Sequence, residues 1–346
     1  MKPDRSKYRQ VVDALVYQIH TGGLAVGEAF PTRREICERF GISLVPAAKV
    51  QQELQLRGLI SRLPGHGFTV NSPERRPMPP LRRIRVMGPR VAIGTDTPVG
   101  GMMLAGIREE AAQNGIEVIQ DYPDVLNNTG FQVRQWKLPP DEGLIPSGDV
   151  YNLPEFASVL ANPFSRIVLF NNVAWEHTAV LVDNYHGMEE LLRYHRERGA
   201  RRVLFVGRCA VSPLLFNESE RHFLFEKLAA QMGFEFQSNV TGNFRSALEQ
   251  AKAFRPDGIL FTADDVALHF QLSYLPSANL PNAIVTGFDD IILFPKKYPA
   301  DACRRLTTYH VDFVEMGRRA VRLLFHIPHY HCELLHERVK GQLLIR

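Results

Sequence analysis

The sequence has no run of 18 or more apolar residues and none of the short motifs of the common enzyme families. The first absence excludes a helix long enough to cross a membrane. The missing motifs are Gly-x-Ser-x-Gly, the Walker loop, Gly-x-Gly-x-x-Gly after a strand and His-Glu-x-x-His. We therefore expect a protein that is not an enzyme and that uses no cofactor. The N-terminus also lacks the apolar stretch of a secretion signal, so we expect a cytoplasmic protein.

Cysteine is scarce and scattered. The four cysteines are Cys37, Cys209, Cys303 and Cys332, with no Cys-x-x-Cys pair among them. Reduced core or surface thiols are the favoured interpretation. A zinc site is the alternative, because the HIPHYHC stretch at residues 326–332 holds three histidines and a cysteine. A solvated loop between a helix and a strand explains that stretch as well, and no metal is expected.

Charge is distributed unevenly along the 346 residues. Residues 1–86 hold 15 Lys and Arg against 7 Asp and Glu, a net charge of +8, and the remaining 260 residues carry −4. Basic charge in a short terminal segment is typical of a domain that binds a polyanion, although an ordinary solvated surface is the alternative. The length predicts two or three domains, and the hydrophobic content of 45% with 23% charged residues is that of a globular protein.

Residues 11–40 carry the pattern of two helices. Apolar residues recur at helical spacing over 11–19, and the segment 21–23, Thr-Gly-Gly, ends that helix. Thr32, followed three residues later by Glu35, predicts a capping box that opens the second helix. Gly41 ends the second helix.

A third helix and a hairpin follow. Ser43 is the expected N-cap of the third helix, whose first turn tolerates Pro46. Residues 59–63 and 68–70 alternate as strands around a tight turn at 64–67. This order of elements predicts a winged helix-turn-helix, in which the third helix lies in the DNA major groove.

The same segment resembles the GntR-type winged helix. The resemblance is carried by FPTRREICERFGIS at 30–43, ELQLRGLI at 53–60 and PGHGFTV at 64–70. It implies that Arg34 contacts phosphate and bases, and that the wing tip enters the minor groove. The residues expected to contact operator DNA are Arg33, Arg34, Ser43, Pro46, Lys49, Gly65, His66 and Gly67.

The segment also departs from that family. Leu44 and Ala48 stand where the family usually carries arginines, and Pro46 replaces a threonine. Base reading by two arginines is therefore absent, so the operator need not match that of the family. For Arg34 an ion pair with Glu38, four residues on, is the alternative role.

The predicted domains are a DNA-binding domain over 1–71, a linker over 72–87 and a larger domain over 88–346. Pro73, Pro77, Pro79 and Pro80 favour an extended, semi-rigid linker. The arginines of this segment could contact DNA phosphates or simply keep an exposed linker soluble.

Short apolar strands alternate with amphipathic helices after residue 87. They start with 91–94 as a strand and 100–114 as a helix, and the alternation repeats in two halves up to 283–286. The pattern predicts an α/β fold of two doubly wound parallel sheets, with a ligand in the cleft at the carboxyl ends of the strands. Residues 121–142 stay unassigned.

This second part is similar to the effector-binding domain of LacI/GalR-type regulators, a relative of periplasmic sugar-binding proteins. The resemblance is carried by VDNYHG at 182–187, RRVLFVG at 201–207, SERHFLF at 219–225, FTADD at 261–265, VTGFDD at 285–290 and LTTYHVDFVEMGRRA at 306–320. It implies a sugar effector held by strand-end and helix residues. The residues expected to bind it are Asp96, Asn171, Arg221, Asp264 and Asp289.

Three of the effector candidates have a structural alternative. Arg221 could be an ordinary surface charge on its helix, Asp289 could be a turn or cap residue, and Asp264 could cap the following helix. Asp264 also stands where the resemblance leads us to expect asparagine, so the effector can differ from the usual sugars.

Together these features predict a homodimeric transcription regulator that binds operator DNA under the control of a small molecule such as a sugar, and they favour repression over activation. Two alternatives remain: a solute-binding protein of the periplasmic type, and an enzyme without a recognisable motif. A GntR-type head fused to an aminotransferase-like domain is not expected, because the second part is too short.

Overall fold

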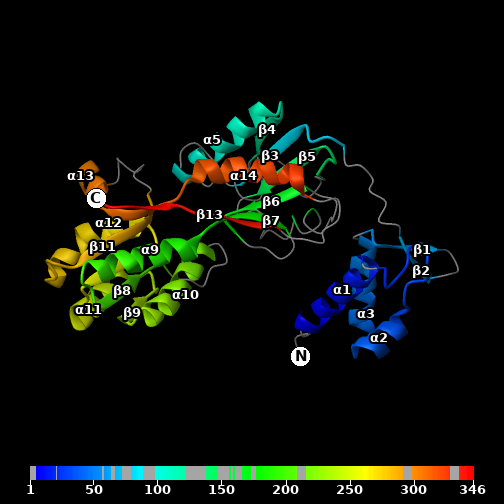
Figure 1. Cartoon of the computed structure of the whole chain (residues 1–346), viewed down its shortest axis with the longest axis horizontal. Helices are drawn as coiled ribbons and strands as arrows, with labels where there is room; N and C mark the ends of the chain where they lie inside the picture. The colour runs from blue at the N-terminus through cyan, green and yellow to red at the C-terminus, as the bar shows by residue number, and fades with distance from the viewer. Residues whose placement is uncertain are drawn as a thin grey trace.

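The computed structural model describes residues 5–20, 22–56, 58–63, 67–71, 79–88, 98–121, 138–146, 156, 159, 166–172, 177–208, 216–290, 298–327 and 335–346. Figure 1 shows a small helical part that contains the N-terminus, followed by two sheets with helices packed on them. We call residues 5–71 the head, and name the two sheets with their helices the N-terminal and C-terminal lobes.

The head consists of three helices and a hairpin, as expected. Its elements are α1 (Arg5–His20), α2 (Arg33–Phe40), α3 (Leu44–Leu56), β1 (Ile60–Leu63) and β2 (Gly67–Val70). The capping box is confirmed: the Thr32 side chain accepts from the Glu35 N–H, and the Thr32 N–H donates to the Glu35 carboxylate. That backbone hydrogen bond holds the pKa of Glu35 below its usual range.

The core of the head is built from the inner faces of the three helices and the hairpin. Leu15, Ile36, Val50 and Leu54 are completely buried there. Strands β1 and β2 pair antiparallel from Ile60↔Val70 onward, and the predicted wing tip at Gly65 and His66 lies outside the described residues. This packing leaves the outer side of α3 open to solvent.

The N-terminal lobe has a six-stranded parallel sheet in the order β13-β7-β6-β5-β3-β4. Its strands are β3 (Arg83–Met87), β4 (Glu117–Asp121), β5 (Glu142–Pro146), β6 (Arg166–Phe170), β7 (Thr178–Val182) and β13 (His336–Val339). Helices α5 (Pro98–Gln113) and α14 (Phe313–His326) pack against each other beside it. Strands β5, β6 and β7 are buried throughout, as expected for a parallel sheet covered on both faces.

The predicted linker over 72–87 is too long at its C-terminal end. Residues 83–87 form β3, a central strand of this lobe. Its arginines are not linker charges, because Arg83 forms an ion pair with Glu117 and Arg85 forms one with Glu142. The partners lie more than 30 residues away in the chain, so the local composition concealed the strand. The strand predicted over 91–94 lies outside the described residues.

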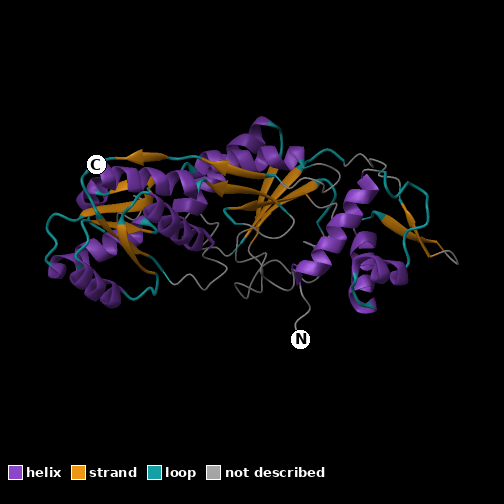
Figure 2. Cartoon of the chain, turned by 60° about the horizontal axis from the view of Figure 1, so that its bottom comes forward, coloured by secondary structure: helices purple, strands orange, loops and turns teal. Residues whose placement is uncertain are grey.

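The C-terminal lobe has the second sheet, in the order β14-β12-β11-β10-β8-β9, parallel except for the antiparallel edge pair β12 and β14. Its strands are β8 (Arg202–Val206), β9 (Glu235–Asn239), β10 (Gly258–Phe261), β11 (Ile284–Asp289), β12 (Thr307–His310) and β14 (Gln342–Leu344). Its helices are α9 (Asn184–Glu197), α10 (Phe216–Gln231), α11 (Phe244–Phe254), α12 (Asp264–Ser273), η4 (Leu275–Ala278) and α13 (Ala300–Arg305). Figure 2 shows helices on both sides of the C-terminal lobe sheet. The predicted α/β class with two doubly wound sheets and an N-terminal helix-turn-helix is confirmed.

Three described segments cross between the lobes. They run from β7 to α9, from β12 to α14 and from β13 to β14; the last is the red segment of Figure 1. The Tyr309 hydroxyl accepts from the Gly341 N–H at 2.7 Å and lies 2.8 Å from His186 Nδ1. Tyr309 of β12 therefore links the three crossing segments, because Gly341 lies between β13 and β14 and His186 lies in the first turn of α9. Burial raises the pKa of Tyr309 to about 12.

Among the described residues no helix is both long and apolar enough to span a bilayer. Cys37 and Cys303 are free thiols, and burial raises the pKa of Cys303. The other two cysteines lie outside the described residues, as do His329 and His331 of the histidine-rich stretch.

Candidate functional site

Arg221 of α10 is the centre of a buried polar cluster at the carboxyl ends of the C-terminal lobe strands. It is only 2% exposed. Its guanidinium donates to both carboxylate oxygens of Asp289, at 2.6 and 3.1 Å, to the carbonyl of Thr262 at 2.6 Å and to Asn184 Oδ1 at 2.9 Å. It also lies over the ring of Phe288, 3.7 Å from the centroid. The alternative that Arg221 is a surface charge is therefore wrong.

Backbone conformation marks the same strand ends. Asp289 closes β11 with φ of 94°, and Asp290 follows with φ of 57°. Asn171 follows β6 in the other lobe with φ of 53°. Non-glycine residues in this left-handed region are uncommon and tend to gather at functional sites. Both lobes therefore have a non-glycine residue with positive φ at the carboxyl end of a strand.

A chain of hydrogen bonds joins Asn171 to Arg221 across the lobes. Asn217 Nδ2, at the start of α10, donates to the Asn171 carbonyl at 2.9 Å. Asn217 Oδ1 accepts from Asn184 Nδ2 at 3.0 Å, and Asn184 Oδ1 accepts from Arg221. The structure thus connects three of the predicted effector residues, Asn171, Arg221 and Asp289, through two asparagines.

Asp264 lies in the same lobe but makes a different contact. It is 2% exposed, and its Oδ1 accepts from the Thr308 hydroxyl of β12 at 2.6 Å. The alternative that it caps α12 is wrong, because the N-cap position is held by Ala263 and has no side-chain cap bond. Its carboxylate is committed to the packing of α12 against the sheet.

Arg208, Asp265 and Glu218 form a second polar cluster that the sequence did not single out. Arg208 follows β8 and donates to Asp265 Oδ1 at 2.6 Å; its Nε lies 3.2 Å from Glu218. Glu218 also accepts from the hydroxyl of Thr262, whose carbonyl binds Arg221. The Arg208 and Asp265 side chains are 43% and 24% exposed, so this cluster faces solvent while sharing Thr262 with the buried pair. The placement of Arg208 two residues after a strand was the signal that could have found it.

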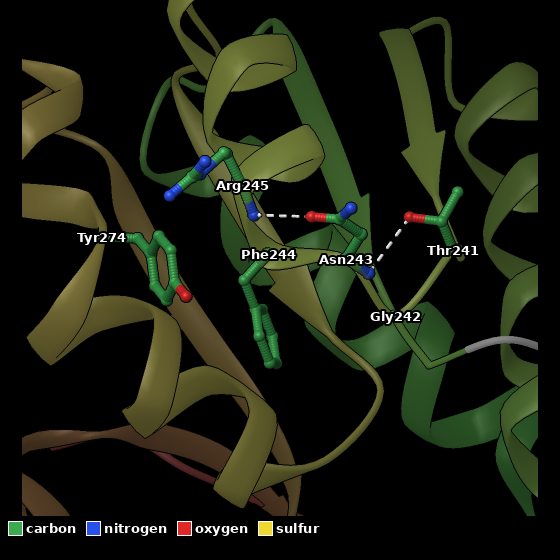
Figure 3. Close-up of a pocket in the computed structure, with 6 residues that line it drawn as sticks. All are labelled: Thr241, Gly242, Asn243, Phe244, Arg245 and Tyr274. Carbon is green, nitrogen blue, oxygen red and sulfur yellow. Dashed lines mark hydrogen bonds between the residues drawn. The ribbon is translucent and has the colours of Figure 1, made fainter.

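A pocket opens elsewhere in the C-terminal lobe, at the N-terminus of α11 (Figure 3). It is lined by Thr241, Gly242, Asn243, Phe244, Arg245 and Tyr274. Asn243 already accepts from the N–H groups of Arg245 and Ser246, so the helix N-terminus is capped by the protein itself. None of the predicted effector residues lines it.

The predicted DNA contacts are spread over α2 and α3. Arg34 is highly exposed and pairs with Glu38 at 3.0 Å, so the alternative ion pair is present. Such an exposed pair is worth little and is readily exchanged for another partner. Arg33 donates to Gln51, while Lys49 is exposed on α3.

The remaining predicted contacts flank these helices. Ser43 precedes α3, and its carbonyl accepts from the Ala47 N–H in the first turn. Pro46 is half-buried in that turn, and Gly67 opens β2 with φ of 80°. Gly65 and His66 in the head, and Asp96 in the N-terminal lobe, fall outside the described residues.

Comparison with protein families gives one match in the head and another in the two lobes. The model for bacterial regulatory proteins of the gntR family matches residues 7–70, and the model for a periplasmic binding protein-like domain matches residues 192–329. The chain joins a GntR-type helix-turn-helix domain to a periplasmic-binding-protein-like domain. It is a transcription regulator with a GntR-type DNA-binding domain.

Solved structures share the fold of this regulator's two lobes. The trehalose repressor from Escherichia coli is 13% identical with a TM-score of 0.54, covering 76% of this chain and 99% of that one. The LacI family transcriptional regulator CCPA from Weissella paramesenteroides with bound glucose is 14% identical with a TM-score of 0.54, covering 76% and 96%. The lac repressor dimer bound to operator and the anti-inducer ONPF is 14% identical with a TM-score of 0.56, covering 76% and 92%. No curated protein has a significant sequence match to this chain.

Proposed function

We propose that this regulator is a repressor, and that a small polyhydroxylated molecule, most simply a sugar, controls its binding to operator DNA. The observation that carries the proposal is the buried Arg221–Asp289 pair at the carboxyl ends of the strands, linked to Asn171 of the other lobe. A preorganised carboxylate and guanidinium suit hydroxyl groups, which both donate and accept hydrogen bonds.

In this proposal Arg221 mainly holds the side chains of Asp289 and Asn184 in place. Its four hydrogen bonds occupy four of its five N–H groups, so it has one donor left for a ligand. Asp289, with its side chain 11% exposed, offers remaining lone pairs at the surface of the cluster. The partly exposed Arg208 and Asp265 supply further donors and acceptors beside it.

Control of DNA binding would act through the lobes. A ligand that bridges Asn171 in one lobe and Asp289 in the other favours a closed arrangement by its differential affinity for that state. We propose that two copies associate through the lobes, so that closure changes the spacing of two heads on two half-sites. Residues 1–71 are the proposed DNA-binding unit, and the effector-binding unit starts with the lobe itself at about residue 79.

The test is fluorescence anisotropy of the full chain with DNA from upstream of its own gene, at fixed salt, with and without each member of a sugar panel. A true effector raises the thermal midpoint with concentration, and weakens or strengthens DNA binding in parallel. A chain lacking residues 1–71 should keep the thermal shift and lose DNA binding. A panel of sugars that shifts neither quantity in the full chain contradicts the sugar assignment.

A further inference from the structure

The first turn of α3 presents aliphatic side chains to solvent. Leu44 and Val45 are adjacent and are 62% and 67% exposed. The opposite side of the helix is used for packing, with Ala47, Val50 and Leu54 fully buried in the head core. The two exposed side chains therefore contribute little to the stability of the head.

Isolated apolar residues on a protein surface are common, but the place of these two side chains in the head indicates a function. α2 ends at Gly41, which has φ of 61°, and α3 starts three residues later, so Leu44 and Val45 lie in the first turn of the second helix of a helix-turn-helix. In that motif the N-terminal residues of the second helix reach the base edges in the major groove.

The chemistry of Leu44 and Val45 determines which base groups they can contact in the major groove. Leu and Val have no donor or acceptor, so they cannot pair with the O6 and N7 acceptors of guanine as arginine does. The apolar group in the major groove is the C5-methyl of thymine. The surrounding charge favours DNA over an apolar protein partner, because exposed Arg34 and Lys49 flank the turn and residues 1–86 carry a net charge of +8.

We propose that Leu44 and Val45 are specificity-determining residues that contact thymine methyl groups and favour T·A pairs in each half-site. This inference rests on the proposed function, because it requires α3 to lie in the major groove. It predicts a recognition rule different from that of a head with arginine at the start of α3.

The experiment starts with selection of binding sites from random duplex DNA by the full-length protein. In the best selected site each thymine of a half-site is then replaced, one at a time, by uracil, which removes only the 5-methyl group. Affinities are measured at one salt concentration for the unaltered protein, for the Leu44→Ala Val45→Ala double variant, and for Val26→Ala. Val26 is a matched control because it is 50% exposed in the turn between α1 and α2.

We expect uracil at one or two positions to lower the affinity of the unaltered protein about fourfold per methyl group. The double variant should bind thymine and uracil sites equally, whereas Val26→Ala should keep the fourfold difference. The inference is overturned if uracil has no effect at any half-site position, or if the double variant keeps the full discrimination. If the full-length protein selects no sequence at all, the proposed function itself fails, and that result is distinct from specific binding without methyl dependence.

Discussion

Arg221 holds Asp289 through two parallel hydrogen bonds inside the C-terminal lobe, and this pair joins α10 to the end of β11. The pair is 68 residues apart in the chain. Neither charge is accessible enough for water to replace the other, so removing one leaves the other buried without a partner.

Arg221→Ala should therefore destabilise the C-terminal lobe by about 3–5 kcal/mol. Chemical denaturation monitored by fluorescence and circular dichroism measures the change. Arg193→Ala on α9, which removes an exposed ion pair with Glu190, is the matched control and should change stability little. Equal effects of the two substitutions would show that burial of the Arg221–Asp289 pair has no energetic consequence.

His195 predicts a pH dependence of stability. It is completely buried, its Nε2 lies 3.0 Å from Thr286 Oγ1, and burial lowers its pKa to about 3. The unfolded chain, with a histidine pKa near 6.5, therefore binds a proton that the folded chain refuses between pH 3 and 6.5. Its contribution to stability is complete above pH 6.5 and is lost as the pH falls, by up to about 1.4 kcal/mol per pH unit.

His195→Gln should reduce the slope of unfolding free energy against pH over that window. The control is His222→Gln, which changes a half-buried histidine paired with Glu226 and should leave most of the slope in place. Urea unfolding at several pH values from 4.5 to 7.5 gives both slopes. An unchanged slope in His195→Gln would mean that other groups control the acid sensitivity.

The contact of α5 with α14 depends on two glycines. A Cβ at Gly106 would overlap the Val314 carbonyl, and one at Gly317 would overlap the Met103 carbonyl. Backbone atoms cannot move aside as side chains do, so Gly106→Ala should destabilise the N-terminal lobe by about 1–3 kcal/mol despite the better helix propensity of alanine. Ala105→Ser, at the exposed neighbouring position, is the control. Thermal unfolding that ranks the two variants equally would contradict close helix packing.

Tyr309→Phe tests the connection between the lobe crossings. The change removes the hydroxyl that binds Gly341 N–H and His186 while keeping the ring packed near Phe288. We expect a loss of about 1–2 kcal/mol, because the Gly341 N–H loses its acceptor. Small-angle scattering with and without effector should show an altered change in radius. A variant with unchanged stability and unchanged closure would exclude a role for this hydroxyl.

Lys49→Ala tests whether α3 faces the DNA backbone. If Lys49 neutralises a phosphate, the slope of log affinity against log salt should fall by about one. Lys227→Ala on α10 is the control, because that lysine is exposed but belongs to the C-terminal lobe. Anisotropy titrations over a series of salt concentrations measure both slopes, and parallel slopes for Lys49→Ala and the unaltered chain would remove Lys49 from the interface.

Local signals predicted the elements of this regulator well. Thr32 and Glu35 marked the start of α2, because a capping box depends on residues three apart. The alternation of strands and helices predicted both sheets, because burial on two faces requires continuous apolar strands. Strand ends pointed to Asn171 and Asp289, because parallel strands deliver their carboxyl ends to one edge.

Features that depend on distant residues could not be predicted. Arg221 reaches Asn184 and Asp289 only because the strand order brings α9, α10 and β11 together. β3 was mistaken for a linker because its arginines are neutralised by Glu117 and Glu142, far along the chain. The role of Asn217 could not be predicted from the sequence, because it depends on hydrogen bonds to Asn184 and Asn171 that link the two lobes.

The final twelve residues serve both lobes at once. β13 covers one side of β7 in the first sheet, and β14 closes the edge of β12 in the second. A shortened chain that stops at Ile327 would uncover the backbone edge of the fully buried strand β7 together with the edge of β12. Open edges of this kind invite pairing with other chains. Truncation at the C-terminus should therefore make the regulator prone to aggregation, because two strands, one in each lobe, lose a neighbour at once.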